Sequence, residues 1–187
     1  MSSRAEKIEA EFPPGVKMPD ELRRVCDFLD RTGYPISGSM RLRPEGRALE
    51  AWFGEGSDAW KQLAGFGSGP DGSILASWLY AGQDMAAAPV VHLGSEGDAL
   101  VVLADDFRCF LQLLGIGYDE LGFDDLSQPP KQPKSAERLR EWLMSEYGIS
   151  CPETGAALVS AAQSHHPDFE SWTDAAQELR DAKERQS

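Results

Sequence analysis

The fold is decided by the stretch FGSGPDGSILASWLY, residues 66–80, which leads through glycine-rich turns into an alternating run of apolar residues. Between residues 73 and 80 the side chains repeat with the period of two that is typical of a β-strand. One face of this strand would carry Ile74, Ala76, Trp78 and Tyr80, and the other Leu75, Ser77 and Leu79. Because both faces are mostly apolar, we predict a central strand that is covered on both sides.

The next stretch along the chain, PVVHLGSEGDALVVL at residues 89–103, predicts two further short strands. Gly94, Ser95, Glu96 and Gly97 are typical turn residues and separate the two apolar runs. Asp105 then precedes an amphipathic helix, in which Phe107, Phe110, Leu111 and Leu114 share one face. The pattern as a whole predicts an α+β core of a sheet with a helix packed on it.

Upstream of this core, the pattern predicts a helix and a hairpin. An apolar stripe follows Asp20 and ends before Gly33, as expected for a helix of about three turns. Apolar residues alternate on both sides of the turn at residues 44–46, which predicts a β-hairpin over residues 36–53. Residues 1–18 are polar and then rich in proline, and we predict a flexible leader there.

Downstream, the run QPPKQP predicts a proline-rich linker at residues 126–134. Helical patterns fill residues 135–187, which are too few to enclose a large core of their own. We therefore predict an α+β domain over residues 19–125 and a C-terminal helical extension that packs back on it. The sheet is expected to be mixed, mostly antiparallel, and flanked by helices.

The charge of the chain restricts its partners. In 187 residues, 18 Lys and Arg stand against 31 Asp and Glu, which gives a net charge of −13. Such a field repels nucleic acid and anionic membrane surfaces and favours a cationic partner. The alternative is that the negative charge keeps the protein soluble and has no role in binding a partner. The three cysteines are far apart without CxxC spacing, and the first residues lack the apolar core of a signal peptide, so we predict a cytoplasmic protein.

No motif for catalysis, cofactor or metal stands out. Residues 67–72 match GxGxxG, but they open a strand and not a helix, and Pro70 removes an amide donor. His92 lies in an apolar run and is predicted to be a buried, hydrogen-bonded histidine, and we expect the side chains of His165 and His166 to diverge. We predict no cofactor, no metal and no enzymatic activity; a cavity that gathers His92 with two carboxylates would favour an enzyme instead.

The remaining candidate is an acidic surface. Turns on either side of the predicted strands carry Asp71, Glu96 and Asp98, and a later loop carries Asp119, Glu120, Asp124 and Asp125. Together with an aromatic edge, Trp52 or Tyr80, they would form a docking surface for a basic protein. We predict partner binding by these seven carboxylates and Tyr80. The alternative is a solvated rim whose aromatic residues are buried.

The order and spacing of these features resemble the SUKH superfamily, which includes fungal regulators of cell-wall glucan synthesis and many bacterial immunity proteins. The matching residues are Gly67, Gly72, Trp78, Tyr80, Pro89, Val90, Leu93, Gly94, Ser95, Glu96, Gly97, Phe107 and Leu111. The resemblance covers residues 36–114 and fades after the proline-rich linker. It implies an α+β fold and a non-catalytic role, and it carries no catalytic residue to this chain.

The resemblance further implies an immunity protein that binds and blocks a toxin domain, often a nuclease. Nucleases tend to be basic because they hold phosphates, so an acidic binder suits them. Two other hypotheses stay open. One is an intracellular adaptor that binds an endogenous protein, as the fungal relatives do, and the other is an enzyme with an unrecognised site. The sequence leaves the oligomeric state undetermined.

Overall fold

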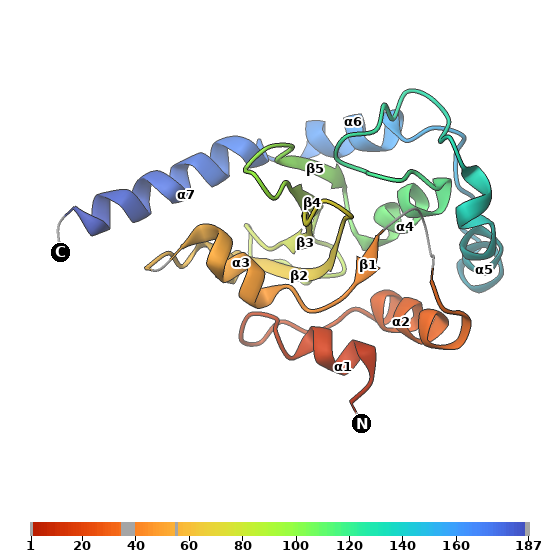
Figure 1. The fold of residues 1–187 in the computed structure, drawn as a ribbon, viewed down its shortest axis with the longest axis horizontal. Helices are drawn as coiled ribbons and strands as arrows, with labels where there is room; N and C mark the ends of the chain where they lie inside the picture. The colour runs from red at the N-terminus through yellow and green to blue at the C-terminus, as the bar shows by residue number, and fades with distance from the viewer. Residues whose placement is uncertain (1, 35–39, 55, 186–187) are drawn as a thin grey trace.

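The computed structural model describes residues 2–34, 40–54 and 56–185, and residues 36–39 of the predicted hairpin lie outside that part. An antiparallel sheet in the order β1-β2-β3-β4-β5 forms its centre, with helices on both faces (Figure 1). The strands are β1 (Arg41–Leu42), β2 (Leu63–Ser68), β3 (Ile74–Trp78), β4 (Val90–Leu93) and β5 (Val101–Ala104). The α+β prediction is confirmed, although every described strand pair is antiparallel and the sheet is not mixed.

The predicted central strand is β3, which pairs with β2 on one side and β4 on the other. All five of its residues are buried. Its alternation separates two apolar cores, because Leu75 belongs to one and Ile74, Ala76 and Trp78 belong to the other. The two apolar faces read from the sequence are therefore the two faces that the helices cover.

The larger core fills the space between one face of the sheet and the helices α1 (Arg4–Glu9), α2 (Asp20–Thr32), α4 (Phe107–Ile116) and α5 (Glu137–Tyr147). Val159 of a further helix, α6 (Ala156–His165), also belongs to this core. Phe66 of β2 lies at the centre, edge-on to Phe107 and Phe110 of α4 at centroid distances of 5.4 and 5.6 Å. The helical spacing of these phenylalanines in the sequence is what directs both rings toward the sheet.

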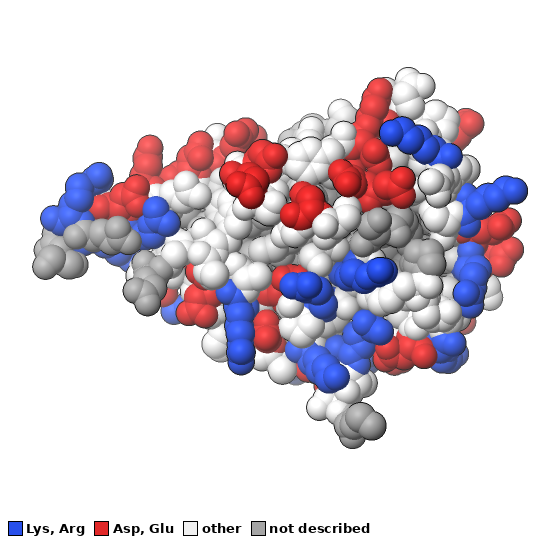
Figure 2. All heavy atoms as spheres, in the orientation of Figure 1, with Lys and Arg blue, Asp and Glu red and all other residues white. Residues whose placement is uncertain are grey.

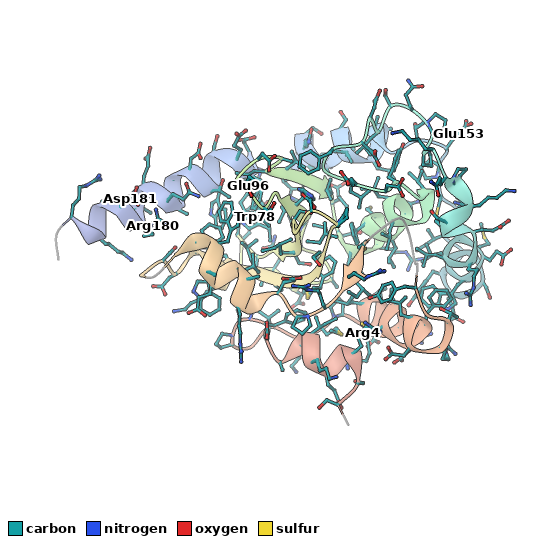
Figure 3. The ribbon with its side chains drawn as sticks, viewed as in Figure 1. Arg4, Trp78, Glu96, Glu153, Arg180 and Asp181 are labelled. Carbon is teal, nitrogen blue, oxygen red and sulfur yellow. The ribbon has the colours of Figure 1, made fainter. Side chains whose placement is uncertain are left out.

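The second core lies on the opposite face, under α3 (Gly46–Phe53), α6 (Ala156–His165) and α7 (Phe169–Glu184). Trp78 points into it and packs against Phe169 and Trp172, at centroid distances of 4.9 and 5.3 Å (Figure 3). The C-terminal helices thus cover a face of the central strand. The far half of α7 extends beyond the sheet, and its Leu179 side chain is 66% exposed (Figure 1).

The prediction of a second hairpin strand is wrong, because residues 46–53 form the helix α3. Gly46, Leu49 and Phe53 are buried at helical spacing, whereas Ala51, which the alternating pattern groups with them, is exposed. Arg, Ala, Leu and Glu in this run are strong helix formers, and their propensity outweighs a short alternating pattern. Gly65 of β2 lets the helix approach, since a Cβ there would lie 2.8 Å from a Leu49 methyl group.

The prediction of a flexible leader is also corrected. Ser3 caps α1 in a reciprocal capping box with Glu6, and Ile8 is fully buried against the larger core. The Glu9 carboxylate accepts hydrogen bonds from the Met18 amide and the Arg23 guanidinium, each at 2.8 Å. Residues 3–18 are therefore part of the packed body, because the proline-rich turn carries α1 back onto α2.

The predicted proline-rich linker contacts the body as well. It ends in a short 3₁₀ helix, η2 (Pro133–Ala136), and a second one, η1 (Ala59–Gln62), precedes β2. The Leu126 carbonyl accepts hydrogen bonds from the amides of Gly155 and Ala156 at the start of α6. Within the described ranges, no helix has the length and apolar character needed to cross a bilayer.

The burial of Glu45, just before α3, can be tested by the pH dependence of stability. Only 2% of its side chain is exposed, and Arg43 lies 2.6 Å from its carboxylate. Burial raises the pKa of Glu45, although the charge of Arg43 and a hydrogen bond from Ser68 act in the opposite direction. The folded protein thus holds the proton more tightly than the unfolded chain does.

Protonation of Glu45 therefore stabilises the folded protein. This stabilisation is complete at pH values below the unfolded-state pKa of Glu45, and it is lost as pH rises through the folded-state pKa. Glu45→Gln removes the ionisation, so its free energy of unfolding relative to the wild type is expected to rise as pH increases above the ordinary glutamate pKa of 4.5. Urea denaturation of both proteins at several pH values measures the difference. A difference that stays constant with pH would contradict the assignment.

Candidate functional site

Two of the predicted acidic turns lie at the same end of the sheet. In an antiparallel sheet with sequential strands, the β2–β3 and β4–β5 connections leave from the same end. The first carries Asp71, and the second carries Glu96 and Asp98. The two turns lie next to each other, since a Cβ on Gly72 would lie 3.7 Å from the Cβ of Ser95.

The loop after α4 brings the remaining carboxylates to the same place. Asp119 and Glu120 line a cavity of about 20 Å³ together with Asp71, and Asp119 also lines a shallow hollow with Asp124 and Asp125. Together these turns and the loop form an acidic face, which consists of the seven carboxylates Asp71, Glu96, Asp98, Asp119, Glu120, Asp124 and Asp125. In Figure 2, acidic side chains run along the upper part of the molecule, over α7 as well as over the body, and a group of basic side chains lies below the centre.

Local hydrogen bonds explain why acidic residues occupy these turns. The Asp71 carboxylate accepts from the hydroxyl and the amide of Ser73, at 2.7 and 3.2 Å. Asp124 accepts from the Glu120 amide at 2.9 Å. Burial pushes the pKa of Asp71 upward, but the hydrogen bonds from Ser73 outweigh it and the pKa is lowered. Asp71 therefore stays negatively charged at neutral pH.

Tyr118 fixes the loop that carries most of the acidic face. Its hydroxyl donates to the Gln128 carbonyl at 2.7 Å and accepts from the Gly155 amide at 3.1 Å. The side chain is buried, and burial raises the pKa of the phenol, which remains a hydrogen-bond donor. A loop held at both ends presents its carboxylates without a large ordering cost on binding.

The acidic face lacks internal neutralisation. In the part of the chain that the structure describes, none of its seven carboxylates has a Lys, Arg or His partner within 4.0 Å. Several arginines are paired elsewhere, for instance Arg4 with Asp30 and Arg180 with Asp181, and Figure 3 shows both arginines away from Glu96. The negative potential over this end of the sheet therefore faces the solvent.

Of the two aromatic residues predicted beside the acidic face, only Trp52 lies there. Its indole N–H donates to the Gly94 carbonyl at 3.2 Å and so supports the β4–β5 turn. Tyr80 follows β3 at the opposite end of the sheet, where its hydroxyl lies 3.2 Å from His166 Nδ1 and its ring packs on Trp78. Tyr80 is therefore part of the second core and is separated from the acidic turns.

This placement predicts the behaviour of Tyr80→Phe. The change removes a hydroxyl that contacts His166 and leaves the ring stacked on Trp78, so a loss of about 1 kcal/mol of unfolding free energy is expected. Binding of a protein at the acidic face should be unchanged. Denaturation of the variant measures the free energy of unfolding, and calorimetric titration measures its affinity for the partner. Weakened binding with unchanged stability would show that Tyr80 belongs to the binding surface after all.

Two residues at the acidic face were not recognised from the sequence as part of it. Phe123 is 48% exposed, and its ring stands edge-on to the His92 ring at a centroid distance of 5.9 Å. His92 is buried and hydrogen-bonded, as predicted, but it also lines the cavity together with Asp71. Phe123 has no periodic neighbours, so only the folded loop reveals its exposure.

The expectation that His165 and His166 diverge is wrong. Both rings approach the same carboxylate oxygen of Asp105, at 3.1 and 3.2 Å. Asp105 is free for this contact because Asp106, and not Asp105 as predicted, caps α4 through the Cys109 amide. Among the described residues, no three His, Cys, Asp or Glu side chains are arranged to hold a metal ion.

Three comparisons with known proteins complete the description of the site. No protein-family model, no curated protein and no solved structure matches this chain.

Proposed function

We propose that this chain is a binding protein that docks a basic partner protein on its acidic face, and that the partner is a toxin domain which it neutralises. The observation that carries the proposal is the convergence of seven carboxylates, none with a basic partner among the described residues, at one end of the sheet. The resemblance of residues 36–114 to the SUKH superfamily supports the role in immunity.

Electrostatics explains how such a face would act. A surface of one sign raises the rate of encounter with a surface of the other sign and orients the two before contact. A nuclease toxin carries positive charge where it holds phosphates, so an acidic partner can cover that surface and exclude the substrate. Neutralisation then requires only a stoichiometric complex, and no reaction on this chain.

The test uses the toxin domain that this proposal predicts to be encoded next to the gene. Calorimetric titration is expected to give a one-to-one complex of nanomolar or tighter affinity, and the affinity should fall as salt is raised. Cells that express the toxin should survive only when this protein is present. Tight binding that is insensitive to salt would contradict the electrostatic account, and absence of binding to the neighbouring toxin would contradict immunity.

An adaptor that binds an endogenous protein is the alternative, and the same acidic face would serve it. Gene neighbourhood separates the two hypotheses, because a large secreted protein encoded immediately upstream favours immunity. A gene that stands alone favours the adaptor, whose partner would then be a basic protein of the same cell.

An enzyme is favoured by one observation, since the cavity gathers His92 with Asp71, Asp119 and Glu120. The hydrogen bonds between these side chains differ from those in the active site of a serine hydrolase. Ser73 donates to Asp71, and His92 Nδ1 is bound to the Ala99 carbonyl, so no serine–histidine–carboxylate relay forms among these residues. The cavity of about 20 Å³ also holds only a group of about the size of one water molecule.

A further inference from the structure

A nitrogen of the buried His92 ring is available as a hydrogen-bond acceptor in the small cavity of the acidic face. The His92 side chain is 3% exposed, and its Nδ1 lies 2.8 Å from the Ala99 carbonyl. A carbonyl oxygen only accepts, so Nδ1 carries the hydrogen, and Nε2 of the neutral ring is left with a lone pair. Nothing in the described ranges donates a hydrogen bond to Nε2, and the ring lines the cavity.

The surroundings of this acceptor favour a cation. Asp71, Asp119 and Glu120 line the same cavity as the His92 ring. The rest of the wall is largely apolar and includes Met40, Leu75, Leu114, Leu121 and Phe123. A ligand that suits both parts has a positively charged end that donates hydrogen bonds and an aliphatic stem, which is the chemistry of a lysine side chain.

Size distinguishes lysine from arginine here. The cavity has a volume of about 20 Å³, which is room for one group of the size of water. An ammonium group is about that size, whereas a guanidinium group has four heavy atoms in a plane. The backbone at Gly122 covers the ring closely, since a Cβ there would lie 2.6 Å from His92 Nε2. The cavity therefore admits an ammonium group more readily than a guanidinium group.

We propose that this cavity is a subsite for a lysine of the partner protein, whose ammonium donates to His92 Nε2 and pairs with Asp71. Phe123, 48% exposed beside the opening, would lie along the methylene stem. The inference rests on the proposed function and adds to it a preference for lysine over arginine, which charge alone does not produce. Long-range attraction to seven carboxylates treats lysine and arginine alike.

The experiment uses the full chain with ¹⁵N-labelled histidine and two probes, octalysine and octaarginine, at equal ionic strength. Octalysine is expected to shift the His92 Nε2 resonance saturably and to bind about tenfold more tightly than octaarginine. Octaarginine is expected to leave that resonance in place. A resonance that octalysine does not move overturns the inference.

His92→Asn removes the Nε2 acceptor while an amide N–H remains near the Ala99 carbonyl, and it should abolish the preference for octalysine. His165→Asn is the matched control, because His165 contacts Asp105 away from the cavity, and it should keep the preference. If His92→Asn does not fold, the resonance of the wild-type chain still decides. Equal binding of the two peptides, or no binding of either, would contradict the lysine subsite. The titration with the toxin domain tests independently whether the acidic face binds a basic partner.

Discussion

Replacing Asp119 and Asp125 by lysine is expected to weaken binding of the basic partner about 100-fold, because each change removes one attraction and adds one repulsion on the acidic face. Both side chains are exposed, and among the described residues neither has a Lys, Arg or His within 4.0 Å. Asp125 also accepts hydrogen bonds from the amide and hydroxyl of Ser127, at 3.0 and 2.6 Å, so a small loss of unfolding free energy is expected, which leaves the fold intact. Stopped-flow mixing at about 0.15 M ionic strength, where the Debye length is about 8 Å, should show most of the loss in the association rate.

Asp174→Lys with Glu178→Lys is the matched control. It changes the net charge by the same amount on exposed positions of α7, and neither residue lines the cavity or the hollow of the acidic face. Its effect on the association rate should be much smaller, because a distant charge is screened by salt. Equal losses from the two double variants would mean that net charge, and not the acidic face, governs binding.

Phe169→Ala is expected to lower the free energy of unfolding by about 3–5 kcal/mol, the largest effect on stability among the changes considered. Phe169 is 1% exposed and packs between Trp78 of the central strand and Trp172 of α7. Its removal would leave a cavity between the sheet and the C-terminal helices. Urea denaturation, followed by tryptophan fluorescence, measures the loss.

Leu179→Ala serves as the control on the same helix. Leu179 is 66% exposed, and its truncation should change stability by less than about 0.5 kcal/mol. If Phe169→Ala were equally mild, the C-terminal helices would not form part of the core. A large loss at Leu179 would instead indicate that the far half of α7 contributes to the packing.

The parts of the fold that could be predicted are those with a strong local pattern. The alternation from Ile74 to Trp78 gave the central strand and its two apolar faces, because each position of a buried strand must match the core next to it. The run from Gly46 to Phe53 shows the limit of such patterns. There a strand and a helix both explain the apolar positions, and contact with Gly65 of β2 favours the helix.

The acidic face could be predicted in part for a similar reason. Antiparallel order brings the turn of Asp71 and the turn of Glu96 to one end of the sheet, and the same rule sends Tyr80 to the other end. Phe123 and the cavity side of His92 depend on how the loop after α4 folds back, held by Tyr118. That path is set by contacts distant in sequence, which no local pattern contains.

Carboxylate footprinting of the complex tests the central claim most directly. Carbodiimide labelling of exposed Asp and Glu side chains, with and without the bound partner, reports which carboxylates the partner covers. The account predicts that labelling falls at Asp71, Glu96, Asp98, Asp119, Glu120, Asp124 and Asp125 and stays unchanged at Asp174 and Glu178. Protection confined to α7 or to the α1–α2 side, with the acidic face still fully labelled, would contradict it.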